Sequence, residues 1–157
     1  MTAFSRSVED RYFEDYTPGV TARYGAETVT EEDVLRFARE FDPQWIHVDA
    51  DAAQAGPFGG LIASGWHTAA VMMRVLATSF LNQAASLASP GVDELRWIQP
   101  VRPGDVLSVQ FTVLDARLSR SKPDRGVVRT RIEVFNQNDI PVLRMVAMNI
   151  LRRRADR

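Results

Sequence analysis

The stretch FDPQWIHVDADAAQAGPFGGLIASGWHTAAVMMRVLATS, residues 41–79, combines an aspartate, a histidine five residues later, a glycine-rich loop and a long amphipathic segment. An aspartate and a histidine at this spacing can hold one water molecule between them. The glycines let backbone approach a ligand closely, and the first turn of a helix offers free N–H groups to a developing negative charge. The stretch therefore predicts a site that activates water at the head of a helix.

The apolar pattern after the glycine-rich loop predicts a helix over residues 62–81. Its apolar residues step by four and three, which is the spacing of one helix face. At ~1.5 Å per residue this helix would be roughly 30 Å long, enough to cross a small domain. A short helix over residues 49–55, capped by Asp49, and a loop over 56–60 precede it. The predicted apolar face consists of Ile62, Trp66, Ala69, Met73, Leu76 and Phe80.

The chain before Asp42 shows one strand pattern and one helix pattern. We expect a weakly ordered start, and then a strand over residues 20–29, where apolar and polar side chains alternate. Thr30 and the acidic residues after it predict a helix start, and Pro43 disfavours helical geometry at Asp42. A carboxylate at a helix C-terminus costs roughly 0.5 kcal/mol, which indicates that Asp42 has a role other than stability. The predicted buried face of this helix is Val34, Phe37, Ala38 and Phe41.

The second half of the chain has an apolar period of two, which predicts strands. A connector over residues 82–91 leads into them, and a basic loop spans residues 117–126. A long helix followed by antiparallel strands buries most apolar surface when one curved sheet wraps the helix, so we predict an α+β fold. The predicted strands include residues 95–97, 107–113, 128–134 and 141–151, with turns at 101–105 and 136–139 and a solvated tail at 152–154.

Length and composition limit the possible classes of protein. The 157 residues, 45% hydrophobic and 25% charged, predict a single domain over residues 1–157 with an ordered core at about 12–151. A net charge of −1 argues against nucleic-acid binding, and the absence of cysteine excludes disulfides and thiolate chemistry. The N-terminus lacks a signal peptide's apolar region, and polar residues interrupt the apolar run at 61–81. We therefore expect a cytoplasmic protein that does not cross a membrane.

The motif around residues 42–65 resembles that of the MaoC-like dehydratases, a family that includes (R)-specific enoyl-CoA hydratases. The family motif has an Asp, four residues, a His, another acid two residues later, and a glycine at the head of the central helix. Here these residues are Asp42, His47, Asp49 and Gly65. The segments LRW at 95–97 and PVRPGD at 100–105 also resemble the family's later strand and turn, and the likeness spans roughly residues 15–150. The resemblance implies a single hot-dog fold, in which a curved antiparallel sheet wraps a long central helix.

The resemblance implies reversible addition of water to a trans-2-enoyl thioester, which gives an (R)-3-hydroxyacyl thioester. Asp42 would accept a proton from water while His47 orients that water and shares the proton transfer, and the Gly65 N–H would bind the thioester oxygen. The structural alternatives are a surface carboxylate, a hydrogen-bonding histidine and a close helix–sheet contact. Asp49 is interpreted as a helix cap rather than a catalytic acid, and His67 as a structural residue.

Candidate substrate-binding residues surround this motif. Where this chain has Gln44-Trp45 the family often has Asn-Pro, so the bulky Trp45 is expected to reshape the acyl pocket. Ser64 stands where the family often has His; it is expected to cap the long helix, with an anchoring role toward the Asp as the alternative. The full set is Trp45, Phe58, Gly60 and Ser64, together with Arg120, Lys122 and Arg125 of the basic loop, which could clamp the phosphates of coenzyme A or simply be solvated.

The expected partners are an acyl-CoA substrate and a second copy of the chain. Coenzyme A enters only as part of the substrate, with no other cofactor and no metal. A hot-dog unit exposes a sheet edge and a helix face, which predicts at least a homodimer. Two alternatives share the fold: an acyl-CoA thioesterase, and a non-catalytic module that binds acyl thioesters. An intact Asp–His pair argues against the second.

Overall fold

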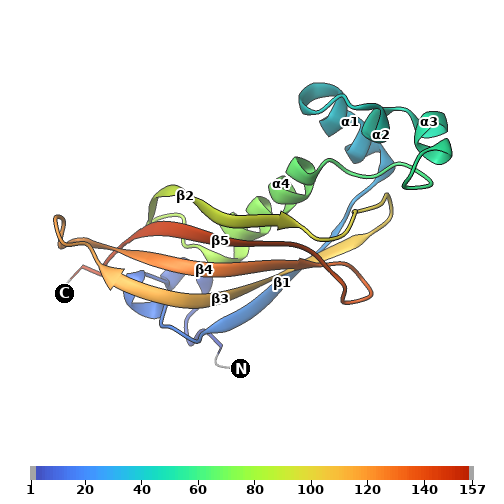
Figure 1. Cartoon of the computed structure of the whole chain (residues 1–157). Helices are drawn as coiled ribbons and strands as arrows, with labels where there is room; N and C mark the ends of the chain where they lie inside the picture. Colours follow the sequence, from blue (N-terminus) through green and yellow to red (C-terminus); the bar gives the residue numbers. More distant parts are fainter. Residues whose placement is uncertain (1–2, 156–157) are drawn as a thin grey trace.

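Five antiparallel strands form one curved sheet in the order β1-β3-β4-β5-β2 (Figure 1). The computed structural model describes residues 3–155. β1 (Thr21–Thr28) and β2 (Ser86–Trp97) are the edge strands, and β3 (Val106–Leu118), β4 (Arg125–Phe135) and β5 (Pro141–Arg152) lie between them. Along β3 and β4 buried and more exposed residues alternate, as expected for a sheet with one face on the core. The hairpin turn between β4 and β5 lies at the predicted position, where the Asn136 N–H donates to Ile140 O.

The predicted connector over residues 82–91 is wrong in its second half, because β2 already begins at Ser86. β2 is an irregular edge strand: its pairing with β5 shifts register at several places, and Glu94 has a φ of 56°. Bulges and the proline at position 90 interrupt the alternation of apolar and polar residues, so the sequence does not show the period of two that predicts a strand. The basic loop is also shorter than predicted, since β3 extends to Leu118 and β4 starts at Arg125.

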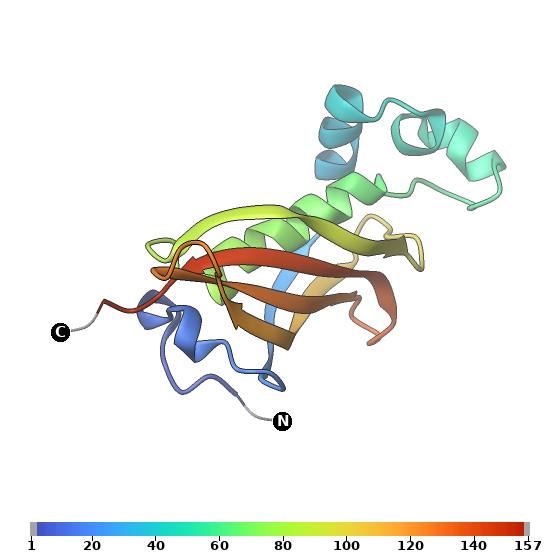
Figure 2. The ribbon, with the colours of Figure 1, turned by 60° about the vertical axis from the view of Figure 1, so that its left-hand side comes forward.

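The central helix is α4 (Gly65–Val75), continued by one π-helical turn, η3 (Leu76–Phe80). It lies in the concave face of the sheet, which confirms the predicted wrapped arrangement (Figure 2). The helix starts three residues later than predicted because Ser64 caps it, with its hydroxyl accepting from the Trp66 N–H.

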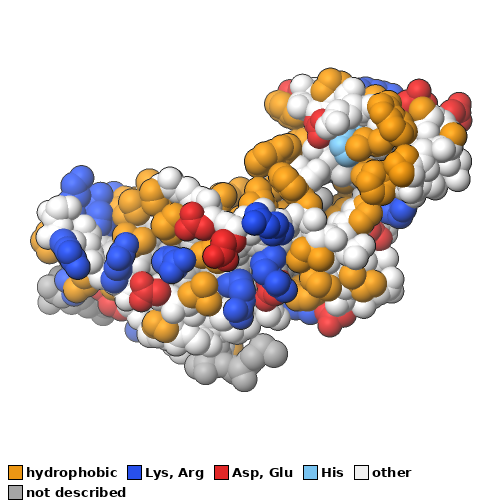
Figure 3. All heavy atoms as spheres, viewed as in Figure 1, with side chains coloured by type: hydrophobic (Ala, Val, Ile, Leu, Met, Phe, Trp, Pro, Cys, Tyr) orange, Lys and Arg blue, Asp and Glu red, His pale blue; other side chains and the backbone are white. Residues whose placement is uncertain are grey.

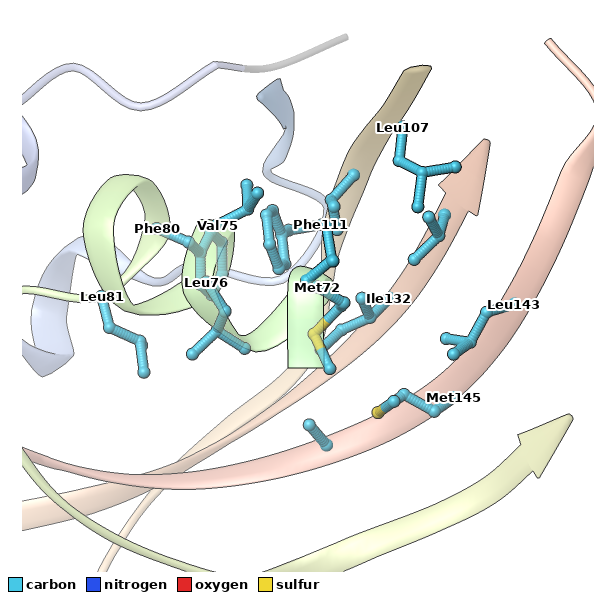
Figure 4. Packing of buried hydrophobic residues seen from close by; sticks show 14 of the residues in the cluster. Met72, Val75, Leu76, Phe80, Leu81, Leu107, Phe111, Ile132, Leu143 and Met145 are labelled. Atoms are coloured by element: carbon cyan, nitrogen blue, oxygen red, sulfur yellow. The ribbon is translucent and has the colours of Figure 1, made fainter. Parts of the chain in front are cut away.

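The buried face of α4 differs from the predicted apolar stripe. Trp66 and Met73 are 59% and 50% exposed. Three residues of the predicted stripe are buried as expected, namely Ile62, Leu76 and Phe80. Within α4 itself the buried side chains lie on the neighbouring face; these are His67, Thr68, Val71, Met72 and Val75. Figure 4 shows part of this core, with Met72, Phe111, Ile132, Leu143 and Met145 pointing toward one another.

Three helices form a lobe at one end of the sheet, hereafter the helical lobe: α1 (Glu31–Phe41), α2 (Trp45–Val48) and α3 (Ala50–Ala55) (Figures 1 and 2). Both predicted caps are present: the side chains of Thr30 and Asp49 accept from the N–H groups of Asp33 and Ala52. α1 rests on α4 through the Phe37 ring, which stacks on His67.

Phe41 was predicted to be buried and is 66% exposed. It is the last residue of α1, where the helix has run past the edge of the body that it packs against.

The N-terminal segment is more ordered than predicted. It forms two 3₁₀ turns, η1 (Val8–Asp10) and η2 (Phe13–Asp15), against the far end of the central helix. The buried Arg11 guanidinium donates to the carbonyls of Ser79 and Phe80, which caps the C-terminus of that helix.

The tail over residues 152–154 is exposed at Arg152 and Arg153, as predicted, but Arg154 is half-buried against the N-terminal segment. Arg152 still belongs to β5, and Arg154 pairs with Asp10 and Asp15 at 2.7 and 2.8 Å. Over residues 3–155, the helices are all too short or too polar to span a bilayer.

Candidate active site

Asp42 and His47 face each other at the junction between the helical lobe and the head of α4. Asp42 is the C-cap of α1, and Pro43 ends that helix as predicted. The chain then turns at once into α2, where the His47 N–H donates to Gln44 O. This single turn brings the imidazole back toward the carboxylate, and Oδ2 of Asp42 lies 3.4 Å from Nε2 of His47.

Both oxygens of Asp42 already accept a hydrogen bond. The Ser64 hydroxyl donates to Oδ2 at 2.6 Å, and the Gln44 amide donates to Oδ1 at 2.7 Å. The Ser64 hydrogen bond is the main reason that the pKa of Asp42 lies below its usual value, with Gln44 and the His47 charge adding to the effect. Asp42 is therefore an ionised and well-anchored carboxylate, and a weak proton acceptor.

The tautomer of His47 follows from its other nitrogen. Nδ1 lies 2.7 Å from the carbonyl oxygen of Ile62. Because a carbonyl only accepts, Nδ1 carries the hydrogen and a neutral ring has its free lone pair on Nε2. The ring is 95% buried, so its orientation is fixed by the packing and this bond together. In the neutral ring His47 therefore presents Nε2 as a proton acceptor next to the Asp42 carboxylate, an arrangement that suits general base catalysis.

Ser64 and Gly65 form the head of α4 beside this pair. The Ser64 hydroxyl does two tasks at once, since it donates to Asp42 and accepts from the Trp66 N–H. Both roles considered from the sequence, cap and anchor, are therefore present. Gly65 is the first residue of the helix, where N–H groups have no intrahelical acceptor. A Cβ on Gly65 would lie 2.4 Å from the Trp97 indole, so the glycine also permits close contact with β2.

A cavity of about 470 Å³ opens at this point. Its volume lies in the range of roughly 300–1,000 Å³ that small-molecule sites occupy. Asp42 and His47 line its polar side, together with Gln44, Thr68 and Gln99. The apolar side is contributed by the helical lobe's end, the head of α4 and the segment after β2: Phe58, Ile62, Ala63, Gly65, Trp66, Trp97, Ile98, Pro100 and Val101. Figure 3 shows hydrophobic side chains on both sides of the junction between the lobe and the sheet.

The structure brings some of the predicted substrate-binding residues to the cavity and leaves others away from it. Phe58 lines the cavity, and Ser64 lies behind the catalytic pair with 0% exposure. Trp45 and Gly60 are outside the lining: the Trp45 ring turns toward Gly56, where a Cβ would come within 2.7 Å of it. The indoles that line the cavity are those of Trp66 and Trp97; for Trp97 the sequence had predicted only a place in a strand.

The basic residues Arg120, Lys122 and Arg125 lie at the opposite end of the sheet from the cavity (Figure 1). They belong to the β3–β4 connection, and β3 carries it away over 13 residues, or roughly 40 Å at ~3.3 Å per residue. Arg125 pairs there with Asp124. Within one chain this loop does not reach the Asp42–His47 pair, and the expected phosphate clamp is not built from it.

Three comparisons place the chain among known proteins. The family model of the MaoC-like domain matches residues 15–137. A solved MaoC-like dehydratase from Rhodospirillum rubrum is 42% identical, with a TM-score of 0.87 over 93% of this chain and 99% of that one. The unliganded R-hydratase PhaJ1 from Pseudomonas aeruginosa is 27% identical, with a TM-score of 0.71 over 94% and 88%.

Among curated sequences, the 3-hydroxyacyl-thioester dehydratase Z of Mycobacterium tuberculosis is 33% identical over 68% of this chain and 72% of its own length. The fold, the Asp–His pair and these matches agree, and the chain belongs to the MaoC-like dehydratase family. The resemblance noted in the sequence is thereby confirmed.

Proposed function

We propose that the protein hydrates trans-2-enoyl thioesters reversibly to (R)-3-hydroxyacyl thioesters. The observation that carries the proposal is the pairing of Asp42 Oδ2 with His47 Nε2 at 3.4 Å, on the wall of a cavity beside the head of α4. Membership of a family with hydratases and dehydratases supports the same reaction class.

The geometry favours His47 as the acceptor of the water's proton, which revises the roles expected from the sequence. Both Asp42 oxygens are already hydrogen-bonded and its pKa is lowered, whereas Nε2 of His47 has a free lone pair. In the hydration direction, the water oxygen bonds to C3 of the enoyl group as Nε2 takes one proton. Asp42 stabilises the imidazolium that forms. Return of that proton to C2 completes the addition of one water.

The electrons of the C2–C3 double bond move onto the thioester oxygen as water adds. Gly65 can meet this charge with its N–H, at the positive end of the α4 dipole. Because Gly65 has no side chain, the thioester carbonyl can come close to that N–H. Ser64 and Gln44 hold the Asp42 carboxylate in place through their hydrogen bonds.

A homodimer and an acyl-CoA substrate without further cofactor complete the proposal. β2 is an edge strand, and large apolar side chains are exposed on it and on the neighbouring face of α4, among them Trp66, Met73 and Val92, which are 50–59% exposed. A second copy that covers these side chains and pairs with β2 would remove an apolar patch from water. Light scattering after size exclusion at micromolar concentration should give twice the mass of 17.6 kDa, and a stable monomer contradicts the dimer.

The reaction is tested with purified protein and crotonyl-CoA, whose conjugated absorbance disappears on hydration. We expect turnover, and we expect Asp42→Asn and His47→Gln each to lower kcat by at least ~100-fold, the low end for a general acid–base group. Gln54→Ala, on α3 outside the cavity lining, serves as the matched control. A thiol-trapping dye in the same assay detects thioester hydrolysis, and free thiol without loss of the double bond indicates a thioesterase instead. Full rate in both catalytic variants contradicts the assignment.

A further inference from the structure

We propose that Trp97 restricts the site to short-chain enoyl thioesters, an inference that rests on the hydratase function proposed above. Trp97 is the last residue of β2, and its Cα partner in the sheet is the fully buried Leu143. Its indole packs so closely on the head of α4 that a Cβ added to Gly65 would lie 2.4 Å from the ring. The ring therefore lines the cavity directly beside the glycine that is proposed to bind the thioester oxygen.

A second indole completes this wall. Trp66, one residue after Gly65, contacts Trp97 edge to face with 5.1 Å between the ring centroids. Both rings line the cavity. The pair spans the gap between α4 and β2, which is the direction in which an acyl chain would continue away from the Asp42–His47 pair.

Ala63 and Val101, which line the cavity, are 6% and 3% exposed and belong to the hydrophobic core cluster. Figure 4 shows Met72, Leu143 and Met145 of the same cluster in the space between α4 and the sheet. Cores of this kind are packed like organic crystals, so an alkyl chain cannot thread between those side chains without displacing them.

The face of α4 beyond the two indoles is slim. Ala69 and Ala70 follow Trp66 along that face, and the flexible side chain of Met73 comes next. If the Trp97 ring were absent, a longer apolar chain could enter between this face of α4 and β2, because an indole is the largest obstacle that a side chain can offer. Trp97 is therefore the residue that decides acyl length, and Trp45 is not, since its ring lies outside the cavity.

The test compares kcat/KM for trans-2-enoyl-CoA substrates of increasing length, from crotonyl-CoA to octenoyl-CoA. We expect the wild type to favour crotonyl-CoA by about tenfold or more, and Trp97→Ala to shift the ratio toward octenoyl-CoA by about tenfold or more, the low end of what pocket shape gives in discrimination. Trp97→Phe should shift it less. Trp45→Phe changes an indole that lies outside the cavity, so this control variant should keep the wild-type ratio.

Two results would overturn the proposal: a wild type that uses octenoyl-CoA as well as crotonyl-CoA, or a folded Trp97→Ala variant with an unchanged ratio. Trp97→Phe decides the question if Trp97→Ala does not fold. A wild type that turns over no enoyl-CoA of any length refutes the hydratase function rather than the length limit. In that case calorimetric binding of butyryl-CoA and octanoyl-CoA to the same variants reports the length limit without catalysis.

Discussion

Gly65→Ala gives a sharp test of the contact on which the head of the central helix depends. The new methyl carbon would sit 2.4 Å from the Trp97 indole, and real Cβ contacts are never that short, so the ring or the helix has to move. Overpacking of this kind costs about 1–3 kcal/mol. Alanine otherwise favours a helix over glycine by up to ~1 kcal/mol. The clash is expected to dominate, and urea unfolding should show a less stable protein with the same m-value.

A double-mutant cycle with Trp97→Ala isolates that contact. In the Trp97→Ala background the ring is gone, so Gly65→Ala should become neutral or stabilise by up to ~1 kcal/mol. The propensity of alanine cancels in the cycle, so the coupling energy between the two positions is the overpacking cost of about 1–3 kcal/mol. Gly104→Ala is not a suitable control, because its φ of 92° would strain an alanine. Gly56→Ala is a second variant of the same kind, since a Cβ there would press on the Trp45 indole. Equal destabilisation by Gly65→Ala in both backgrounds would refute the reasoning.

Three further predictions concern the groups around the catalytic pair. Ser64→Ala removes the hydrogen bond that lowers the pKa of Asp42, so the acid limb of the pH profile of kcat/KM should move to higher pH. The rate should also fall about tenfold, as for the loss of a hydrogen bond to a charged group. Profiles of wild type and variant that superimpose would contradict this prediction. Burial lowers the pKa of His67 from 6.5, so below that pH the unfolded chain takes up a proton that the folded state does not, and stability falls as the pH drops toward the folded-state pKa. His67→Phe should flatten this acid-side loss in urea unfolding, and parallel pH curves would argue against it. The Arg102 guanidinium donates to the carbonyl of Phe58, a residue of the cavity wall. Arg102→Ala should therefore raise KM about tenfold with little change in kcat, and Arg102→Lys should recover part of the lost affinity. An unchanged KM in Arg102→Ala would show that Arg102 does not position Phe58.

Much of the fold could be predicted because its signals are local. Thr30 and Asp49 cap helices through their own side chains, and Pro43 ends α1 at Phe41, with Asp42 as the C-cap. The period of two along β3 and β4 reflects a sheet with one buried face. The buried face of the central helix was predicted only in part, because Trp66 and Met73 are apolar and fit the helical spacing but are exposed on the side of α4 away from the core.

The candidate site was predicted as far as its motif extends in the sequence. Asp42 and His47 are five residues apart and meet through one turn of chain, so spacing was informative. Trp97 reaches the site from a strand far along the chain, and only the sheet register places it on Gly65. Trp45 was assigned to the pocket by sequence proximity, but successive residues of a short helix point in different directions, and its ring faces Gly56 instead.

The placement of the helical lobe separates chemistry from folding. Only Val34 and Ala38 of α1, His47 of α2 and Ala53 of α3 are fully buried, while the sheet and α4 supply most of the core. Substitution of exposed polar residues in the helical lobe therefore leaves the main hydrophobic core intact. A library randomised at the exposed positions of the lobe should therefore yield many folded but inactive proteins.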